Sequence, residues 1–508
     1  MRVLQYNWVD PEDLAGRGGG VRVYMQGLVR AQAECAGMQV VTLASGLAHD
    51  LGARAPRWRC VRKGHFEIVN ARPLAPSQAD FASPAQISHP PTESTFRDLL
   101  MRTGPYDVVH FHTLEGLPAQ VLAIAAAQAR VVLSLHNYHT LCPQVNLWWQ
   151  ERGHCTDFAG GARCAICLPQ VPNMQAVRRA YQVETAFARL GIGPGRWPYN
   201  HLLRPALHAG WRGLKRLSRR DTSPPAAPAR SAPFAQRRAQ MIALINAHCA
   251  QVLAVSDCTR AIAQAHGMDR VQTLYIGTGH AREWARTQPR DWPARFGAAR
   301  PLHLTYLGYM RRDKGFDFLL EALRALPPDM ARRVHLRVAA RRGPPAVMAR
   351  LIALRGHLAG LDWQDGYRHA DLSRLLNETD LGVVPPLWQD NLPQTALEMH
   401  ARHIPLLTSD RGGARELGGC DTLTFRAGDT ADFTARLSHV LGGAICLRRY
   451  WARARVPQSM DQHAQDLIHR YRQLSRESCH ERPDPYRYSE NRHLVDTGVP
   501  WPEPRRTG

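Results

Sequence analysis

The sequence predicts an α/β protein made of two Rossmann-like, doubly wound domains. Its 508 residues exceed what one hydrophobic core usually serves, so at least two domains are expected. In both halves, short runs rich in Val, Ile and Leu alternate with helical patterns. This alternation is typical of βαβ units, in which helices cover both faces of a buried parallel sheet.

The elements follow one another in a regular order. The strands expected in the first half cover residues 2–8, 39–44, 107–112 and 130–136, with a helix over 21–34. Those expected in the second half cover 302–307, 334–339, 381–385 and 405–409, with helices over 316–326, 346–357 and 394–402. The domains should therefore span 1–250 and 251–445, followed by a helical segment at 446–477 and a disordered tail at 478–508.

Positive charge is concentrated in one segment. The chain carries 65 Lys and Arg against 43 Asp and Glu, and its net charge of +22 suggests anionic partners. A basic insertion at 178–240 holds 13 Lys and Arg against Glu184 and Asp221, a net charge of +11. The apolar residues that recur there at helical spacing are Leu203, Leu207, Trp211 and Leu214. Such a helix lies either on an anionic membrane surface or on its own domain. The low-complexity run at 222–233 should be loop or disorder.

Two features that the sequence lacks, a secretory signal and a membrane span, indicate the cellular compartment of the protein. The start MRVLQYNWVD reads as a strand without the features of a secretory signal, and no window has the roughly 18 consecutive apolar residues of a membrane span. Eleven unevenly spaced cysteines fit reduced thiols better than a disulfide framework. We therefore expect a cytoplasmic protein, either soluble or peripheral at the inner face of the membrane.

An acidic loop in the second half predicts a site for a sugar. Residues 388–398 read WQDNLPQTALE, so Asp390 precedes the start of a helix and Glu398 lies eight positions later. Amides at a helix start face anions or hydroxyls, and carboxylates form strong charge-assisted hydrogen bonds with hydroxyls. The spacing alone is weak evidence, because it also occurs by chance.

The surrounding sequence is more specific. It resembles the retaining glycosyltransferases of the GT-B fold, family 4 type, also called glycosyltransferase group 1, whose acidic pair is spaced E-x7-E. Asp390 stands at the first acidic position and Glu398 at the second, while the stretch IPLLTSD followed by Gly412, Gly413 and Glu416 is similar to the family's strand and glycine turn.

The resemblance implies roles for these residues. Glu398 would hold the ribose hydroxyls and Asp390 the transferred hexose, assisted by the amides of Asn391, Leu392 and Pro393. It also implies two domains that face a central cleft, and a helix near residues 461–474 that returns to the first domain.

A basic loop follows the strand expected over 302–307. The sequence GYMRRDKG at 308–315 resembles the family's G-R-L-x3-K-G loop, whose two cations neutralise the nucleotide diphosphate. Lys314 matches the family's Lys, whereas Tyr309 replaces its Arg, so the second cation should come from Arg311 or Arg312. Such cations would stabilise the charge on the leaving diphosphate, and no cofactor would be required for catalysis.

The first half should bind the acceptor. The glycine turn GRGGG at 16–20 lets the amides of Gly19 and Gly20 approach a phosphate, although a plain flexible turn is the alternative. His112 and His136 stand at expected strand ends, where open α/β sheets bind ligands, although core packing is the alternative for a strand histidine. The resemblance places His136 at the reacting sugar.

A cysteine cluster lies in the segment after His136. Its members are Cys142, Cys155, Cys164 and Cys167. Four thiolates could form a structural zinc site. Because the spacings differ from standard zinc ribbons, the alternative is a set of free or disulfide-capable thiols.

Together these features predict an enzyme that transfers a hexosyl unit from a nucleotide-diphosphate sugar to a glycan or lipid-linked acceptor with retention, as in polysaccharide or glycoconjugate biosynthesis. A related sugar-phosphate synthase or phosphorylase is disfavoured, because the cofactor-lysine motif and the longer synthase signatures are absent. A non-catalytic basic adaptor that binds anionic membrane or nucleic acid is the other alternative. For nucleic acid the aromatic residues of the insertion are too sparse to stack bases.

Overall fold

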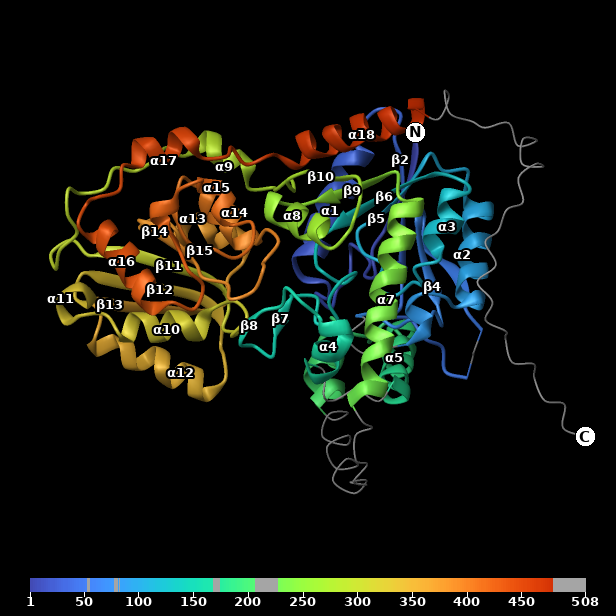
Figure 1. The fold of residues 1–508 in the computed structure, drawn as a ribbon, viewed down its shortest axis with the longest axis horizontal. Helices are drawn as coiled ribbons and strands as arrows, with labels where there is room; N and C mark the ends of the chain where they lie inside the picture. The colour runs from blue at the N-terminus through green and yellow to red at the C-terminus, as the bar shows by residue number, and fades with distance from the viewer. Residues whose placement is uncertain (53–54, 77–80, 82, 168–173, 206–226, 478–508) are drawn as a thin grey trace, which may run out of the picture.

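The computed structural model describes residues 1–52, 55–76, 81, 83–167, 174–205 and 227–477, which form two α/β domains (Figure 1). The expected tail at 478–508 lies outside the described residues, as do Leu207, Trp211 and Leu214 of the expected amphipathic helix. Within the described part of the chain, no helix combines the length and apolar character needed to cross a membrane.

The first domain is built on an eight-stranded sheet of order β10-β9-β6-β5-β1-β2-β4-β3. Its strands are β1 Arg2–Tyr6, β2 Gln39–Ser45, β3 Arg57–Arg62, β4 His65–Val69, β5 Val108–Phe111, β6 Arg130–Leu135, β9 Gln251–Ala254 and β10 Val271–Thr273. All pairs are parallel except β3 with β4. The carboxyl ends of the parallel strands therefore share one edge, where ligands bind in folds of this kind.

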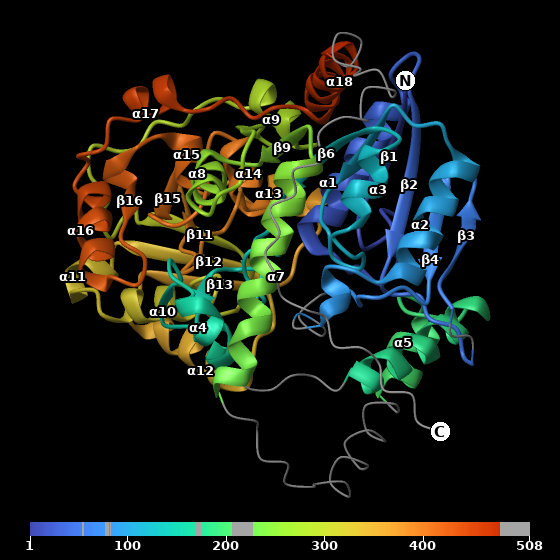
Figure 2. The same ribbon diagram turned by 45° about the vertical axis from the view of Figure 1, so that its right-hand side comes forward.

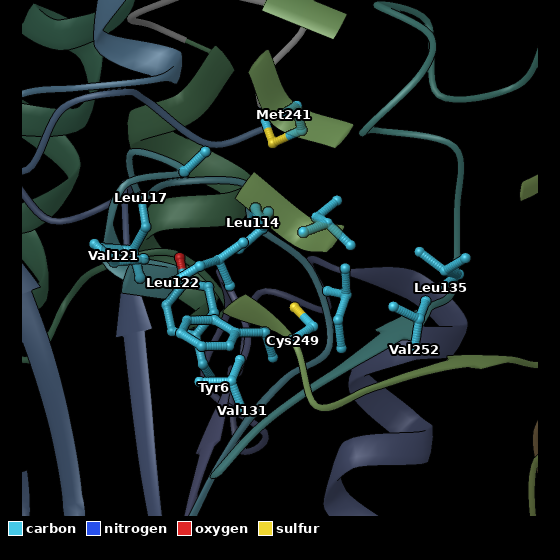
Figure 3. Close-up of a cluster of buried hydrophobic side chains, with 14 of the residues drawn as sticks. Tyr6, Leu114, Leu117, Val121, Leu122, Val131, Leu135, Met241, Cys249 and Val252 are labelled. Carbon is cyan, nitrogen blue, oxygen red and sulfur yellow. The ribbon is translucent and has the colours of Figure 1, made fainter. Parts of the chain in front are cut away.

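Helices cover both faces of this sheet. The helices of this domain are α1 Gly19–Ala33, α2 Pro90–Thr103, α3 Val121–Ala126, α4 Ala162–Cys167, α5 Met174–Arg189, α7 Ala227–His248, α8 Asp257–Ala265 and α18 Met460–Glu477. Side chains alternate between the faces along each strand, so Val3 packs in the cluster that contains Met25 of α1, and Leu4 in the cluster that contains Met241 of α7. Figure 3 shows the second of these clusters, in which Met241 and Cys249 lie over Tyr6 and Val131.

The second domain has a six-stranded, entirely parallel sheet of order β13-β12-β11-β14-β15-β16. The strands are β11 Leu302–Tyr309, β12 Val334–Arg341, β13 Gly360–Asp365, β14 Leu381–Val384, β15 Leu406–Ser409 and β16 Thr424–Phe425. The helices are α9 Ala281–Arg286, α10 Phe316–Arg324, α11 Pro328–Ala331, α12 Pro345–Ile352, α13 Leu372–Leu375, α14 Gln394–His400, α15 Arg415–Gly418, α16 Thr430–Leu441 and α17 Leu447–Arg453. This order of strands and helices confirms the predicted pair of doubly wound domains.

The chain crosses between the domains twice. After α17 it runs back to the first domain, where α18 lies on α1 (Figure 1). The contact includes a 2.7 Å hydrogen bond between the Tyr24 hydroxyl and His463 Nε2. Further along α18, the Tyr471 hydroxyl lies 2.6 Å from His110 Nδ1 at the sheet.

Two expectations from the sequence need correction. The strands β9 and β10 pair within the first sheet, so that sheet continues to Thr273, beyond the boundary expected at residue 250. The run 222–233 was expected to be loop or disorder, but α7 begins at Ala227 and contains Pro233. Residues 222–226 lie outside the described residues.

The basic insertion is also less solvated than its charge suggested. Arg237 of α7 is buried, with its guanidinium 3.7 Å from the centre of the Phe81 ring and 3.1 Å from the His139 carbonyl oxygen. Burial, followed by the nearby charge of Arg238, lowers the pKa of Arg237 to about 9. Part of the insertion is therefore a core helix of the first domain.

Glu416 joins the two domains. Its carboxylate in α15 accepts hydrogen bonds from the backbone amides of Asp257, at 2.9 Å, and Cys258, at 2.7 Å, in the first turn of α8. The Tyr275 hydroxyl donates to the same carboxylate. A negative charge from the second domain thus satisfies the amides at the positive end of a first-domain helix.

Replacing Glu416 should weaken this junction. We expect Glu416→Ala to lower the free energy of unfolding by about 1–3 kcal/mol, because two amides and a hydroxyl lose their acceptor. The matched control is Glu321→Ala, since Glu321 is 66% exposed on α10. Calorimetry of both variants gives the measurement, and an equal melting temperature in the two would contradict the assigned role.

Candidate active site

The acidic loop between β14 and α14 is held by a glycine turn. Gly412 has a φ of +77°, and a Cβ there would overlap the carbonyl oxygen of Asp390. The Gly413 amide donates to that oxygen at 2.9 Å, and the Gly412 amide donates to Gln389 Oε1 at 2.8 Å. The loop therefore depends on a backbone approach that only glycine permits.

Lys314 reaches this loop from the end of β11. Gly315, with a φ of +72°, packs against the carbonyl oxygen of Pro385 so closely that a Cβ would overlap it. This packing holds Lys314 Nζ 2.6 Å from Asp390 Oδ2 and 4.8 Å from the centre of the Trp388 ring. A cation and a carboxylate thus meet at the carboxyl end of the second sheet.

The structure does not bring Arg311 or Arg312 to this pair. Arg311 forms an ion pair with Asp313 at 2.8 Å, and Arg312 forms one with Glu151 of the first domain at 3.1 Å. Both side chains are mostly exposed, at 65% and 60%. Neither arginine joins Lys314 at Asp390 as the expected second cation.

The glycine turn of the first domain faces the acidic loop. Gly18 and Gly19 have positive φ values, and the 15-residue helix α1 begins at Gly19. At Gly20 a Cβ would lie 3.3 Å from the Gln394 side chain of the second domain. The positive end of α1 therefore lies next to the start of α14, the helix that follows Asn391, Leu392 and Pro393.

Asn391 is unusual in this loop. It is 4% exposed, and neither its Oδ1 nor its Nδ2 has a hydrogen-bond partner among the described residues. A buried amide without partners is costly, so such a group commonly awaits a ligand or an ordered water.

Glu398 lies in a separate, more buried setting. It is 2% exposed, and the Tyr367 hydroxyl donates to its Oε2 at 2.7 Å. Burial raises the pKa of Glu398 to about 7, although the Tyr367 hydrogen bond and the charge of Arg402 oppose the shift. Near neutral pH this carboxyl group is thus divided between its two protonation states.

Two histidines complete this setting. His369 Nε2 lies 3.4 Å from Glu398 Oε1, and His280 Nε2 lies 3.9 Å from it. Among the described residues, these three side chains form the one group of three or more potential metal ligands within 4.8 Å of one another. No local motif predicts this group, because His280 follows a strand of the first sheet, whereas His369 and Glu398 follow strands of the second.

His112 and His136 do meet at the edge of the first sheet. His112 Nε2 lies 2.8 Å from Gln5 Oε1, an acceptor, so the His112 proton is on Nε2. Its Nδ1 then accepts from His136 Nε2 at 3.1 Å. This relay leaves His136 Nδ1 as a lone-pair acceptor, without a hydrogen-bond partner among the described residues.

Both histidines are held neutral. Burial, followed by the nearby charge of His463, lowers the pKa of His136 to about 3, and burial also lowers the pKa of His112. His136 can therefore accept a hydrogen bond from a hydroxyl at neutral pH, but it cannot supply a positive charge.

Buried histidines should make stability depend on pH. Burial lowers the pKa of His463 to about 4, whereas an unfolded histidine titrates near 6.5. The unfolded chain then binds more protons, so stability should fall as the pH is lowered from about 6.5 towards 4, by about 1–2 kcal/mol per such histidine at pH 5. We expect the difference in melting temperature between pH 7.5 and pH 5 to be smaller for His463→Gln than for the unaltered chain. An equal difference would contradict this explanation.

The cysteine cluster does not form a metal shell in the structure. Cys142, Cys155 and Cys164 are buried and Cys167 is half-buried. Arg238 Nη2 donates to Cys164 Sγ at 3.2 Å, and Gln144 Nε2 donates to Cys167 Sγ at 2.6 Å. Burial raises the pKa of Cys142 to about 11 and that of Cys155 to about 11, which favours the thiol form in the absence of a metal.

Comparison with known proteins agrees with this geometry. Residues 301–442 match the family model described as "Glycosyl transferases group 1". This range contains Lys314, Asp390 and Glu398. No curated protein sequence matches the chain.

Solved structures share the two-domain fold. Sucrose-phosphate synthase from Thermosynechococcus elongatus is 15% identical, with 94% of this chain and 100% of that chain covered at a TM-score of 0.52. The UDP-forming α,α-trehalose-phosphate synthase from Burkholderia vietnamiensis is 13% identical, with 94% and 98% covered at 0.52. The α,α-trehalose 6-phosphate synthase from Burkholderia multivorans is 12% identical, with 97% and 99% covered at 0.52. The chain thus has the two-domain GT-B fold of these structures, and residues 301–442 of its second domain match the glycosyl transferases group 1 family.

Proposed function

We propose that this enzyme transfers a hexosyl unit from a nucleotide-diphosphate sugar to a glycan or lipid-linked acceptor, with retention of anomeric configuration. The observation that supports this most is the pairing of Lys314 with Asp390, next to the glycine turn that starts α1 in the other domain. An ammonium group and a positive helix end on opposite domains suit the diphosphate of such a donor.

The remaining residues suit the rest of the donor. Asp390 would exchange its contact with Lys314 for a hexose hydroxyl, which frees the ammonium group for the diphosphate. The unpartnered amide of Asn391 would bind the hexose or the phosphate next to it. Glu398, in its more buried setting, would accept hydrogen bonds from the ribose hydroxyls, as carboxylates commonly do with sugars.

Transfer would proceed on the face from which the diphosphate leaves. The bond between the anomeric carbon and the diphosphate oxygen breaks, the acceptor oxygen bonds to that carbon, and the departing diphosphate takes the hydroxyl proton. Lys314 and the amides of Gly19 and Gly20 would stabilise the charge that develops on the diphosphate. Neutral His136 would accept a hydrogen bond from a hydroxyl of the transferred sugar.

A donor screen tests the proposal directly. Purified protein is heated with UDP-, GDP-, ADP- and CMP-sugars, and donor hydrolysis is measured in parallel. A UDP-sugar is a natural first candidate, since one of the similar structures is named as a UDP-forming synthase. Binding at 100 times the dissociation constant stabilises a protein by about 2.7 kcal/mol, which a melting curve resolves. Stabilisation by none of the sugars would reject the proposal.

Removal of the Glu398 charge should abolish transfer. We expect Glu398→Gln to lower kcat/KM at least about 100-fold, which corresponds to about 2.7 kcal/mol, without lowering the melting temperature. In the unaltered enzyme, donor KM should rise as the pH falls below about 7, because protonated Glu398 loses acceptor capacity. Glu321→Gln is the control for an exposed carboxylate. Retained activity in Glu398→Gln would remove Glu398 from the site.

Metal analysis addresses the cysteines separately. We infer that catalysis needs no metal, and that Cys142, Cys155, Cys164 and Cys167 hold a structural zinc after their thiols ionise and converge. Purified enzyme should then contain about one zinc per chain, and Cys164→Ser should lose it. Chelation that stops transfer without unfolding would contradict metal-free catalysis, and clearly less than one zinc in fully active enzyme would end the structural role.

A further inference from the structure

A cavity of about 600 Å³ lies in the first domain, away from Lys314 and Asp390. It is lined by Arg72 after β4, His89 at the start of α2, and Arg178 and Gln182 of α5. Its volume is in the range of pockets that bind small molecules. Figure 2 shows α5 below β4 and β3, and Figure 1 shows it below β4.

The cavity belongs to the ligand-binding edge of the first sheet. Gln182 Nε2 donates to the Asp50 carbonyl oxygen, and the Tyr181 hydroxyl donates to the Ala75 carbonyl oxygen, so α5 rests on the loops that follow β2 and β4. Glu184 of the same helix lies 3.6 Å from Arg17 in the glycine turn. These contacts place α5 beside the edge that also carries His112 and His136.

The two arginines of the cavity have no acidic partner in the part of the chain that the structure describes. Among the described residues, no carboxylate forms an ion pair with Arg72 or Arg178. Burial, followed by the charge of Arg72, lowers the pKa of Arg178. Asp50, an acidic residue of the loops that α5 contacts, is already paired with Arg57 and Arg189. Two guanidinium groups thus repel each other across a cavity, and an anion between them would remove that repulsion.

His89 adds a donor from a third direction. Its Nδ1 accepts from the Thr92 amide at 3.3 Å and lies 2.8 Å from the Thr92 hydroxyl, so its proton is on Nε2. The same residue is the N-cap of the 14-residue helix α2, whose positive end meets the cavity. Glu93 opposes this charge, but its carboxylate accepts from the His89 amide and the Ser88 hydroxyl.

We propose that this cavity binds a phosphoryl group of the acceptor through Arg72, Arg178 and His89. Donors from three separate elements suit the three terminal oxygens of a phosphoryl group, and two guanidinium groups without an acidic partner among the described residues match its double negative charge. The proposal rests on the proposed function in one respect: it names the acceptor as a phosphorylated molecule, either a soluble sugar phosphate or a lipid-linked one.

Inorganic phosphate is the first probe. The full chain is titrated with phosphate by calorimetry, alongside Arg72→Gln, Arg178→Gln and the control Arg179→Gln, whose side chain is exposed on the next position of α5. We expect Arg179→Gln to bind like the unaltered protein, and the other two variants to bind at least about tenfold more weakly. Arg178→Gln should fold at least as stably, because it removes a repulsion.

Two further measurements identify the source of the phosphoryl group and distinguish a failure of this proposal from a failure of the proposed donor site. Cosedimentation with phosphatidylglycerol vesicles that requires both arginines would indicate a lipid-borne phosphoryl group, and phosphate binding without cosedimentation would indicate a soluble one. Stabilisation by nucleotide sugars should be the same in all variants, so its absence everywhere would reject the proposed function alone. Equal phosphate affinity in Arg72→Gln, Arg178→Gln and Arg179→Gln, or no phosphate binding at all, would overturn the phosphoryl site.

Discussion

Backbone packing at the carboxyl ends of β11, β14 and β15 is the constraint on which the site depends. Gly315 lies against Pro385, Gly412 against Asp390 and Gly413 against Asn391, each closer than a Cβ would allow. These three contacts stack the ends of neighbouring strands, so the Lys314 ammonium group and the Asp390 carboxylate meet without a long or flexible connection. The chemistry of this loop thus depends on residues that contribute no side chain at all.

The same site shows how electrostatic settings differ over a short stretch of chain. Asp390 lies beside a cation, whereas Glu398, one helix further on, is buried against a tyrosine hydroxyl and two histidines. Burial disfavours the charged form of Glu398, and the neutral histidines do nothing to restore it. The carboxylate of Asp390 is thus paired with an ammonium group, whereas the pKa of Glu398 lies close to neutral pH.

Much of the fold could be predicted, because hydrophobic runs and helical periods mark buried strands and the helices between them. The sheet to which β9 belongs could not be predicted, because the apolar pattern of β9 would suit a strand of either sheet. In the structure β9 pairs with β6 of the first sheet. The burial of Arg237 could not be predicted because charge alone does not report burial, and its contacts with Phe81 and His139 come from distant parts of the chain. Asp390, Glu398 and Lys314 could be proposed as site residues from the sequence because each belongs to a local motif. Tyr367, His280 and His369 were missed because only the tertiary fold brings them to Glu398.

The two crossings between the domains lie side by side. The Thr278 amide donates to the Gln458 carbonyl oxygen at 2.9 Å, and Thr278 forms an isolated parallel β-bridge with Ser459. The outgoing and returning chains are therefore hydrogen-bonded to each other where they cross. Gly277 lets them approach, because a Cβ there would press on His463 and Ser459. The covalent connection between the domains is therefore doubled at a single place, and any relative movement of the domains that separates Thr278 from Gln458 would break this hydrogen bond.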